Sequence, residues 1–110
     1  MTFDQGDLVA VDFNPAMGHE PAKFRPAVVA SATRFNRSSS LTVVIPVTSS
    51  NNGYPMHEYL EVPDCDIQGW ACVEQMKAMD LSARRCKKLG VVDDEAMSNI
   101  LNKIGAVFDI

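Results

Sequence analysis

The sequence has no apolar run that approaches the roughly 20 residues of a membrane-spanning helix. Its amino terminus, MTFDQGDLVAVDF, has neither the basic segment nor the apolar segment of a secretory signal peptide. These two absences predict a cytoplasmic protein without a membrane partner. The sequence also has only two histidines and three cysteines, and no two cysteines form a C-x-x-C pair. This scarcity argues against a disulfide framework and against a zinc site, so we expect no metal and three small, apolar or half-exposed cysteines.

What the sequence does have is an ordinary globular composition, with 46% hydrophobic and 22% charged residues in a chain of 110. A chain of this length predicts a single domain, residues 1–110, with a modest core. The formal net charge is −4, but the charges are unevenly distributed. Residues 21–57 include no acid and four basic residues, and residues 77–88 include five basic residues against one acid. An unevenly charged surface and a local polyanion site both fit this pattern, and charge alone leaves the two open.

The hydrophobic pattern predicts many short strands followed by one helix. Pro46 lies near the end of the most strand-like segment and indicates an edge strand or a bulge there. Apolar residues then recur at helical spacing, and Asp93 is the expected N-cap of a helix over 93–108. The fold class is therefore mainly β, a small closed or open barrel with a carboxy-terminal helix. The expected strands are 8–13, 27–30, 41–47, 56–62, 70–75 and 89–92, and the expected turns include 35–40, 63–69 and 78–80.

Polar side chains suited to RNA cleavage without a metal gather at strand ends and loops. Such a reaction needs a base for the 2′-hydroxyl proton, donors for the charge on the phosphoryl oxygens, and an acid for the departing 5′-oxygen. Arginine holds phosphate oxygens through two bonds, a threonine hydroxyl adds a neutral donor, and histidine or a carboxylate transfers protons. The three clusters are His19-Glu20 with Arg25, Thr48 with Ser49, and Glu74-Gln75 with Lys77.

Each of these residues also has an ordinary interpretation. A single loop histidine such as His19 is more often a surface residue, as is His57 on an alternating strand, and Glu20 and Glu74 are ordinary carboxylates by default. Arg25 is harder to explain in this way, because it directly precedes Pro26 at the entry to a buried strand and needs a partner or a ligand there. The residues alone therefore leave a phosphate or nucleic-acid site as one alternative among several.

Four motifs in order resemble the MazF/PemK (Kid) family of bacterial toxin–antitoxin systems, and the resemblance covers nearly the whole chain. They are GDLVAVDFNPAMGHE at 6–20, FRPAVV at 24–29, VIPVTS at 43–49 ahead of GYP at 53–55, and GWACVEQMKAMDLSARR at 69–85.

The resemblance implies an SH3-like β-barrel with a terminal helix, the fold that the family shares with the gyrase poison CcdB. It implies a homodimeric toxin, a sequence-specific, metal-independent endoribonuclease without a cofactor, that cleaves single-stranded RNA. An acidic antitoxin protein would neutralise it, and operator DNA would be bound only by the toxin–antitoxin complex. The alternative is a catalytically silent member of the same fold that acts by binding, such as a gyrase poison or an antitoxin- or operator-binding module.

The resemblance also assigns roles to residues. Arg25 matches the family's catalytic arginine and Thr48 its catalytic threonine, both acting on the phosphate. His19 and Glu20 match a G-H-E motif, and Glu74 matches a carboxylate that one branch uses as the base. The residues expected to bind substrate are Lys23, Phe24, Ser49, Gln75 and Lys77.

The sequence departs from the family pattern at four positions. Pro21 and Lys23 replace a glutamine and a glycine and predict a stiffer, more basic loop. Cys72 replaces a catalytic arginine of the PemK/Kid branch, which favours the scheme based on Arg25 and Thr48. Ala10 replaces a frequent tryptophan, with no consequence that follows from the residues.

Overall fold

The computed structural model describes residues 2–13, 24–51 and 53–110. Its elements follow the order β1–β2–α1–β3–β4–β5–β6–β7–α2, with three short 3-10 turns. No described helix combines the length and apolar character that a bilayer crossing requires. The elements are β1 (Asp7–Asp12), β2 (Phe24–Val29), α1 (Thr33–Ser38), β3 (Thr42–Thr48), β4 (His57–Val62), η1 (Pro63–Cys65), β5 (Ile67–Cys72), η2 (Val73–Gln75), β6 (Lys77–Met79), η3 (Leu81–Ala83), β7 (Cys86–Val91) and α2 (Asp94–Val107).

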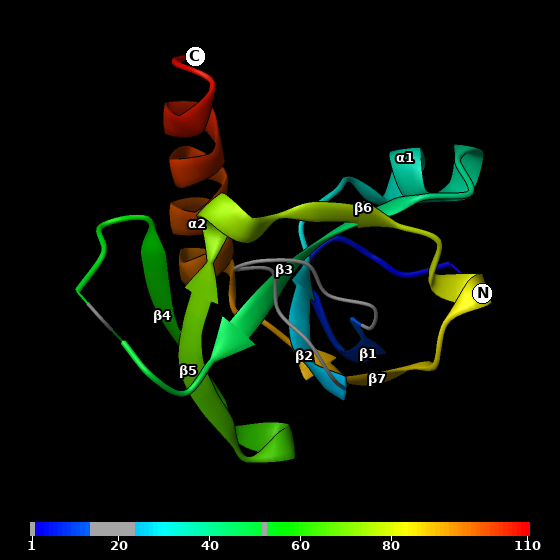
Figure 1. The fold of residues 1–110 in the computed structure, drawn as a ribbon, viewed down its shortest axis with the longest axis horizontal. Helices are drawn as coiled ribbons and strands as arrows, with labels where there is room; N and C mark the ends of the chain where they lie inside the picture. The colour runs from blue at the N-terminus through cyan, green and yellow to red at the C-terminus, as the bar shows by residue number, and fades with distance from the viewer. Residues whose placement is uncertain (1, 14–23, 52) are drawn as a thin grey trace.

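The strands form one antiparallel sheet in the order β4-β5-β3-β2-β1-β7, and β6 pairs with the first half of β3. Figure 1 shows β3 passing between the β4–β5 hairpin on one side and β2, β1 and β7 on the other. The arrangement is a strongly curved, half-closed barrel with a carboxy-terminal helix. It confirms the predicted fold class.

The three central strands are buried on both faces, which explains their nearly continuous apolar sequence. Along β1 the side chains alternate: Leu8 packs beneath α2, whereas Val9 and Val11 pack in a second cluster on the opposite face. In β2 the same alternation places Val28 in the first cluster and Val29 in the second. Because both faces are filled, a shift of one residue in either strand would exchange the two cores, so the register is firmly fixed.

Helix α2 begins as the sequence predicts. The Asp93 side chain accepts a hydrogen bond of 2.8 Å from the Ala96 amide, and acids occupy the first turn. The helix buries Met97 and Ile100 against the sheet. Near its end, Lys103 Nζ lies 2.6 Å from Glu58 Oε1 on β4. Helix α2 therefore holds the outer hairpin, beside which it stands in Figure 1.

Several local predictions are wrong. Residues predicted as a turn at 35–40 include most of helix α1, which Asn36 anchors by donating to the Phe3 carbonyl oxygen at 2.9 Å. The turn expected at 78–80 lies largely within β6, and β5 begins inside the turn expected at 63–69. Of the two alternatives for Pro46, an edge strand or a bulge, the edge strand is wrong, since β3 is an interior strand. It lies in the gap between the residues of β3 that pair with β6 and those that pair with β5, where the ladder on that side is interrupted.

Candidate active site

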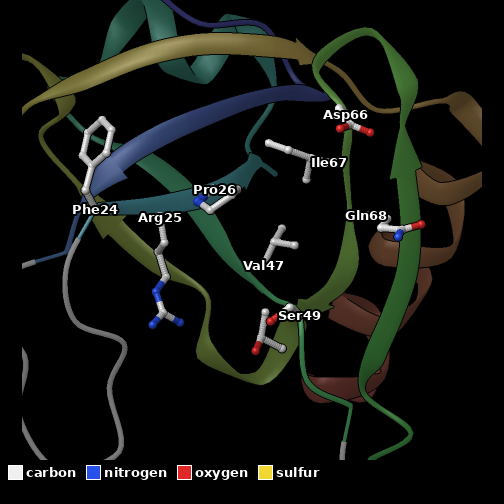
Figure 2. Close-up of a pocket in the computed structure, with 9 residues that line it drawn as sticks. Phe24, Arg25, Pro26, Val47, Ser49, Asp66, Ile67 and Gln68 are labelled. Carbon is white, nitrogen blue, oxygen red and sulfur yellow. The ribbon is translucent and has the colours of Figure 1, made fainter.

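A cavity of about 440 Å³ opens where β2, β3 and β5 meet. Figure 2 shows the lining side chains at the start of β2, at the end of β3 and around the start of β5. The lining is half polar, with one guanidinium, two hydroxyls, a carboxylate and an amide among apolar side chains. The lining residues are Phe24, Arg25, Pro26, Val47, Thr48, Ser49, Asp66, Ile67 and Gln68.

Arg25 enters the cavity from the second position of β2. Pro26 follows it, and proline forces the preceding residue into extended geometry, so Arg25 continues the strand rather than the loop. It pairs with Val11 of β1, whose side chain is fully buried, while its own side chain is half-buried. In Figure 2 the guanidinium extends from β2 toward the end of β3, where Ser49 lies.

Thr48 reaches the same cavity as the last residue of β3. Its Oγ1 accepts a hydrogen bond of 3.2 Å from the Ser50 amide, which orients the side chain without using its hydroxyl hydrogen. Across the sheet, Gly69 lies so close that a Cβ there would stand 2.5 Å from the Thr48 carbonyl oxygen. A glycine at 69 is therefore required for Thr48 to keep its position.

Phe24 forms the outer wall of the cavity and is 42% exposed. The guanidinium carbon of Arg85 lies 4.9 Å from its ring centroid, a cation–π contact between the end of the second basic segment and the cavity. Arg84 beside it donates to the Asp12 carbonyl oxygen at 3.0 Å. The two basic segments of the sequence therefore meet at this wall.

Glu74 lies in η2, immediately beyond β5, and is not part of the cavity lining. Its Oε2 lies 3.0 Å from His57 Nε2, and the side chains are 30% and 7% exposed respectively. The prediction that His57 is a surface residue is therefore wrong. The histidine begins β4, where the alternation that suggested exposure is interrupted by packing against η2 and the Tyr54 ring.

The Cys72 thiol interacts electrostatically with both Glu74 and Arg25. The pKa of this thiol is raised to about 11, chiefly by burial and also by the nearby Glu74 carboxylate, while the Arg25 guanidinium acts in the opposite direction. Glu74 and Arg25 therefore both lie within electrostatic range of one sulfur atom. All three cysteines are free thiols, with Cys72 buried and the other two half-buried.

The structure thus gathers four of the predicted residues, Arg25, Thr48, Phe24 and Ser49, around one cavity. Gln75 lies in η2 and Lys77 in β6, and neither lines it. The predicted residues His19, Glu20 and Lys23, with Pro21, lie outside the described part of the chain.

The wall formed by Asp66 and the first two residues of β5, Ile67 and Gln68, was not predicted, because that segment was expected to be a turn. The strand residues alternate less clearly there, and the turn signals of Pro63 and Asp64 hid the strand that follows. Within residues 2–13, 24–51 and 53–110, no three His, Cys, Asp or Glu side chains are grouped so that they could hold a metal ion.

Comparison with known proteins places the chain in a family. The model of PemK-like, MazF-like toxins of type II toxin–antitoxin systems matches residues 4–108. Among curated proteins, the endoribonuclease toxin ChpB of Escherichia coli K12 is 37% identical over 97% of this chain and 95% of its own length. The endoribonuclease toxin MazF of the same strain is 36% identical over 94% and 92%.

Solved structures agree with this match. MazF from Deinococcus radiodurans superposes with a TM-score of 0.90 at 28% identity, covering 100% of this chain and 99% of that one. A MazE–MazF structure from the same organism has the same fold, with a TM-score of 0.83 at 24% identity over 100% and 98% of the two chains. The chain belongs to the PemK/MazF-like toxin family.

Proposed function

We propose that this protein is an endoribonuclease toxin that cleaves single-stranded RNA without a metal ion. The observation that carries the proposal is the meeting of Arg25 and Thr48 in one cavity, although they come from different strands. Both belong to motifs of a family whose curated members named above are endoribonuclease toxins. A guanidinium and a hydroxyl together supply the donors that a phosphodiester requires as negative charge develops on its oxygens.

The chemistry begins with the RNA itself. The 2′-oxygen attacks the adjacent phosphorus, the bond to the 5′-oxygen breaks, and the products carry a 2′,3′-cyclic phosphate and a 5′-hydroxyl. A base on the protein takes the proton from the 2′-hydroxyl, and an acid gives a proton to the departing 5′-oxygen. Arg25 holds the phosphoryl oxygens through its planar fork, and the Thr48 hydroxyl donates to the same group. Glu74, His19 and Glu20 are the candidates for the two proton transfers.

The nucleotides on either side of the cut are bound by the walls of the cavity. Phe24 offers an exposed ring on which a base can stack, with Arg85 beside it to attract the backbone phosphate. Ser49 and Gln68 offer neutral groups for base edges at the opposite wall. We assign substrate binding to Lys23, Gln75 and Lys77 as well. We further propose that residues 1–110 form one toxin domain.

A partner follows from the family description, which is that of a toxin from a toxin–antitoxin system. We infer that an acidic antitoxin segment covers the cavity and the Phe24–Arg85 wall, because the positive charge gathered there matches it. A cytoplasmic homodimer, with operator DNA bound only through the toxin–antitoxin complex, completes the proposal.

The direct test is cleavage of a single-stranded RNA by the purified protein in excess EDTA. We expect cyclic-phosphate ends, and a loss of at least about 100-fold in rate for Arg25→Ala. Arg37→Ala, at an exposed arginine of helix α1, is the matched control and should keep the wild-type rate. Loss of cleavage on adding EDTA would contradict the metal-independent mechanism. Growth arrest by the Arg25→Ala variant, with no RNA cut, would instead favour a toxin that acts by binding.

A further inference from the structure

The His57–Glu74 pair is the feature that the proposed reaction does not yet explain. The His57 side chain is 7% exposed, and its buried Nδ1 has no hydrogen-bond partner among the residues that the structure describes. An unsatisfied buried polar atom costs about 1–3 kcal/mol, a cost that a leucine or phenylalanine at this position would not carry. Among the described residues, the partner of the imidazole is the Glu74 carboxylate, 3.0 Å from Nε2.

The imidazole is held from several sides. The backbone amide of His57 donates to the Tyr54 carbonyl oxygen at 3.0 Å. The Tyr54 ring contacts the imidazole edge-on, with the ring centroids 5.5 Å apart. The His57 carbonyl oxygen accepts from Lys103 Nζ at 3.4 Å, and Lys103 is in turn paired with Glu58. Across the hairpin, His57 stands opposite Cys72. Backbone and ring are both fixed, so the direction of the Nε2–H bond is fixed as well.

Glu74 is the exposed member of the pair. Its side chain is 30% exposed. The carboxylate and the Arg25 guanidinium both act electrostatically on the Cys72 thiol. The turn η2 that carries Glu74 packs against β3, the strand that ends at Thr48. An exposed carboxylate there is open to substrate, whereas the imidazole is buried. The neutral tautomer with its hydrogen on Nε2 donates to Oε2 and leaves Oε1 as the oxygen that this bond does not use.

We propose that His57 is a positioning residue that orients Glu74 as the base of the cleavage reaction. This inference rests on the proposed function and names one of its proton-transfer groups. Glu74 Oε1 takes the proton of the 2′-hydroxyl as the 2′-oxygen bonds to phosphorus, while the bond to the 5′-oxygen breaks and that oxygen receives a proton from a separate acid. The Nε2–H bond holds the carboxylate in one orientation throughout.

The test uses the different reach of two amides. In His57→Gln the amide NH₂ occupies the place of Nε2 and can still donate to Glu74, whereas in His57→Asn it occupies the place of Nδ1 and cannot. We expect His57→Gln to keep the single-turnover rate within about 3-fold, and His57→Asn and His57→Leu to lower kcat roughly 10-fold or more with an unchanged KM. Thermal unfolding of each variant checks that the chain is folded; if His57→Leu does not fold, the Gln and Asn pair carries the comparison.

A double-mutant cycle separates positioning from mere packing. If His57 acts through Glu74, His57→Leu should cause less than about a 2-fold further loss in the Glu74→Gln background. The inference is overturned if His57→Asn and His57→Gln cleave equally fast, if Glu74→Gln keeps the wild-type rate, or if His57→Leu costs as much in both backgrounds. In each of these cases the wild type still cuts RNA and the proposed function stands. A wild-type protein that cuts no RNA refutes the proposed function and this inference together.

Discussion

The close approach of Gly69 to Thr48 makes one substitution especially informative. In Gly69→Ala the new Cβ would stand 2.5 Å from the Thr48 carbonyl oxygen and 3.1 Å from a methyl group of Val47. Ordinary contacts begin at 3.4 Å, so the end of β3 must move by 3.4 − 2.5, about 0.9 Å. Displacements near 1 Å in a catalytic arrangement cost on the order of 100-fold in rate, and overpacking costs about 1–3 kcal/mol of stability. We therefore expect a folded variant with kcat lowered roughly 10- to 100-fold.

The assay is single-turnover cleavage of an RNA oligonucleotide, with thermal unfolding measured in parallel. Gly90→Ala is the matched control, since its Cβ would stand 3.0 Å from a methyl group of Val62, on a strand that does not line the cavity. The control should lose stability but keep its rate at temperatures where it is folded. A folded Gly69→Ala protein with the wild-type rate would refute the argument that Thr48 must keep its position.

Three further outcomes follow from the structure. Asp93→Ala removes the bond to the Ala96 amide and should lower the free energy of unfolding by about 1 kcal/mol, measured by urea denaturation. The thiol of Cys72 has a pKa of about 11, so at pH 8.5 little of it is in the reactive thiolate form. Iodoacetamide should therefore alkylate Cys72 roughly 100-fold more slowly than free cysteine at that pH. Rapid labelling of Cys72 in the folded protein would contradict this. Arg25→Lys keeps the charge but loses the two-bond fork, so its kcat should fall at least about 10-fold while Arg37→Lys has no effect.

The sequence predicted best those elements that local signals determine. Helix α2 could be predicted because apolar spacing, an Asp93 cap and first-turn acids agree. Helix α1 could not, because its second half runs into the serines at 38–40, which are typical of a turn, and it is fixed instead by the distant bond between Asn36 and Phe3. Strand β6 was missed for a similar reason, since its three residues form a strand only by pairing with β3.

For the site, local rules placed Arg25 at a strand entry and Thr48 at a strand end, but they could not bring the two together. That convergence depends on the curvature of a sheet in which β3 pairs with β2, β5 and β6, and this long-range pairing leaves no mark on short stretches of sequence. The burial of His57 was missed because it comes from packing against Tyr54 and η2 rather than from the alternation of its own strand.

The most direct test of the account is a double-mutant cycle on Arg25 and Thr48 in single-turnover cleavage with EDTA present. If the guanidinium and the hydroxyl act on the same phosphate, each single alanine variant should lose much of the rate, and the double variant should be little slower than the slower single one. Full activity in either single variant, or two losses that simply multiply, would contradict the claim that these side chains serve one scissile phosphodiester.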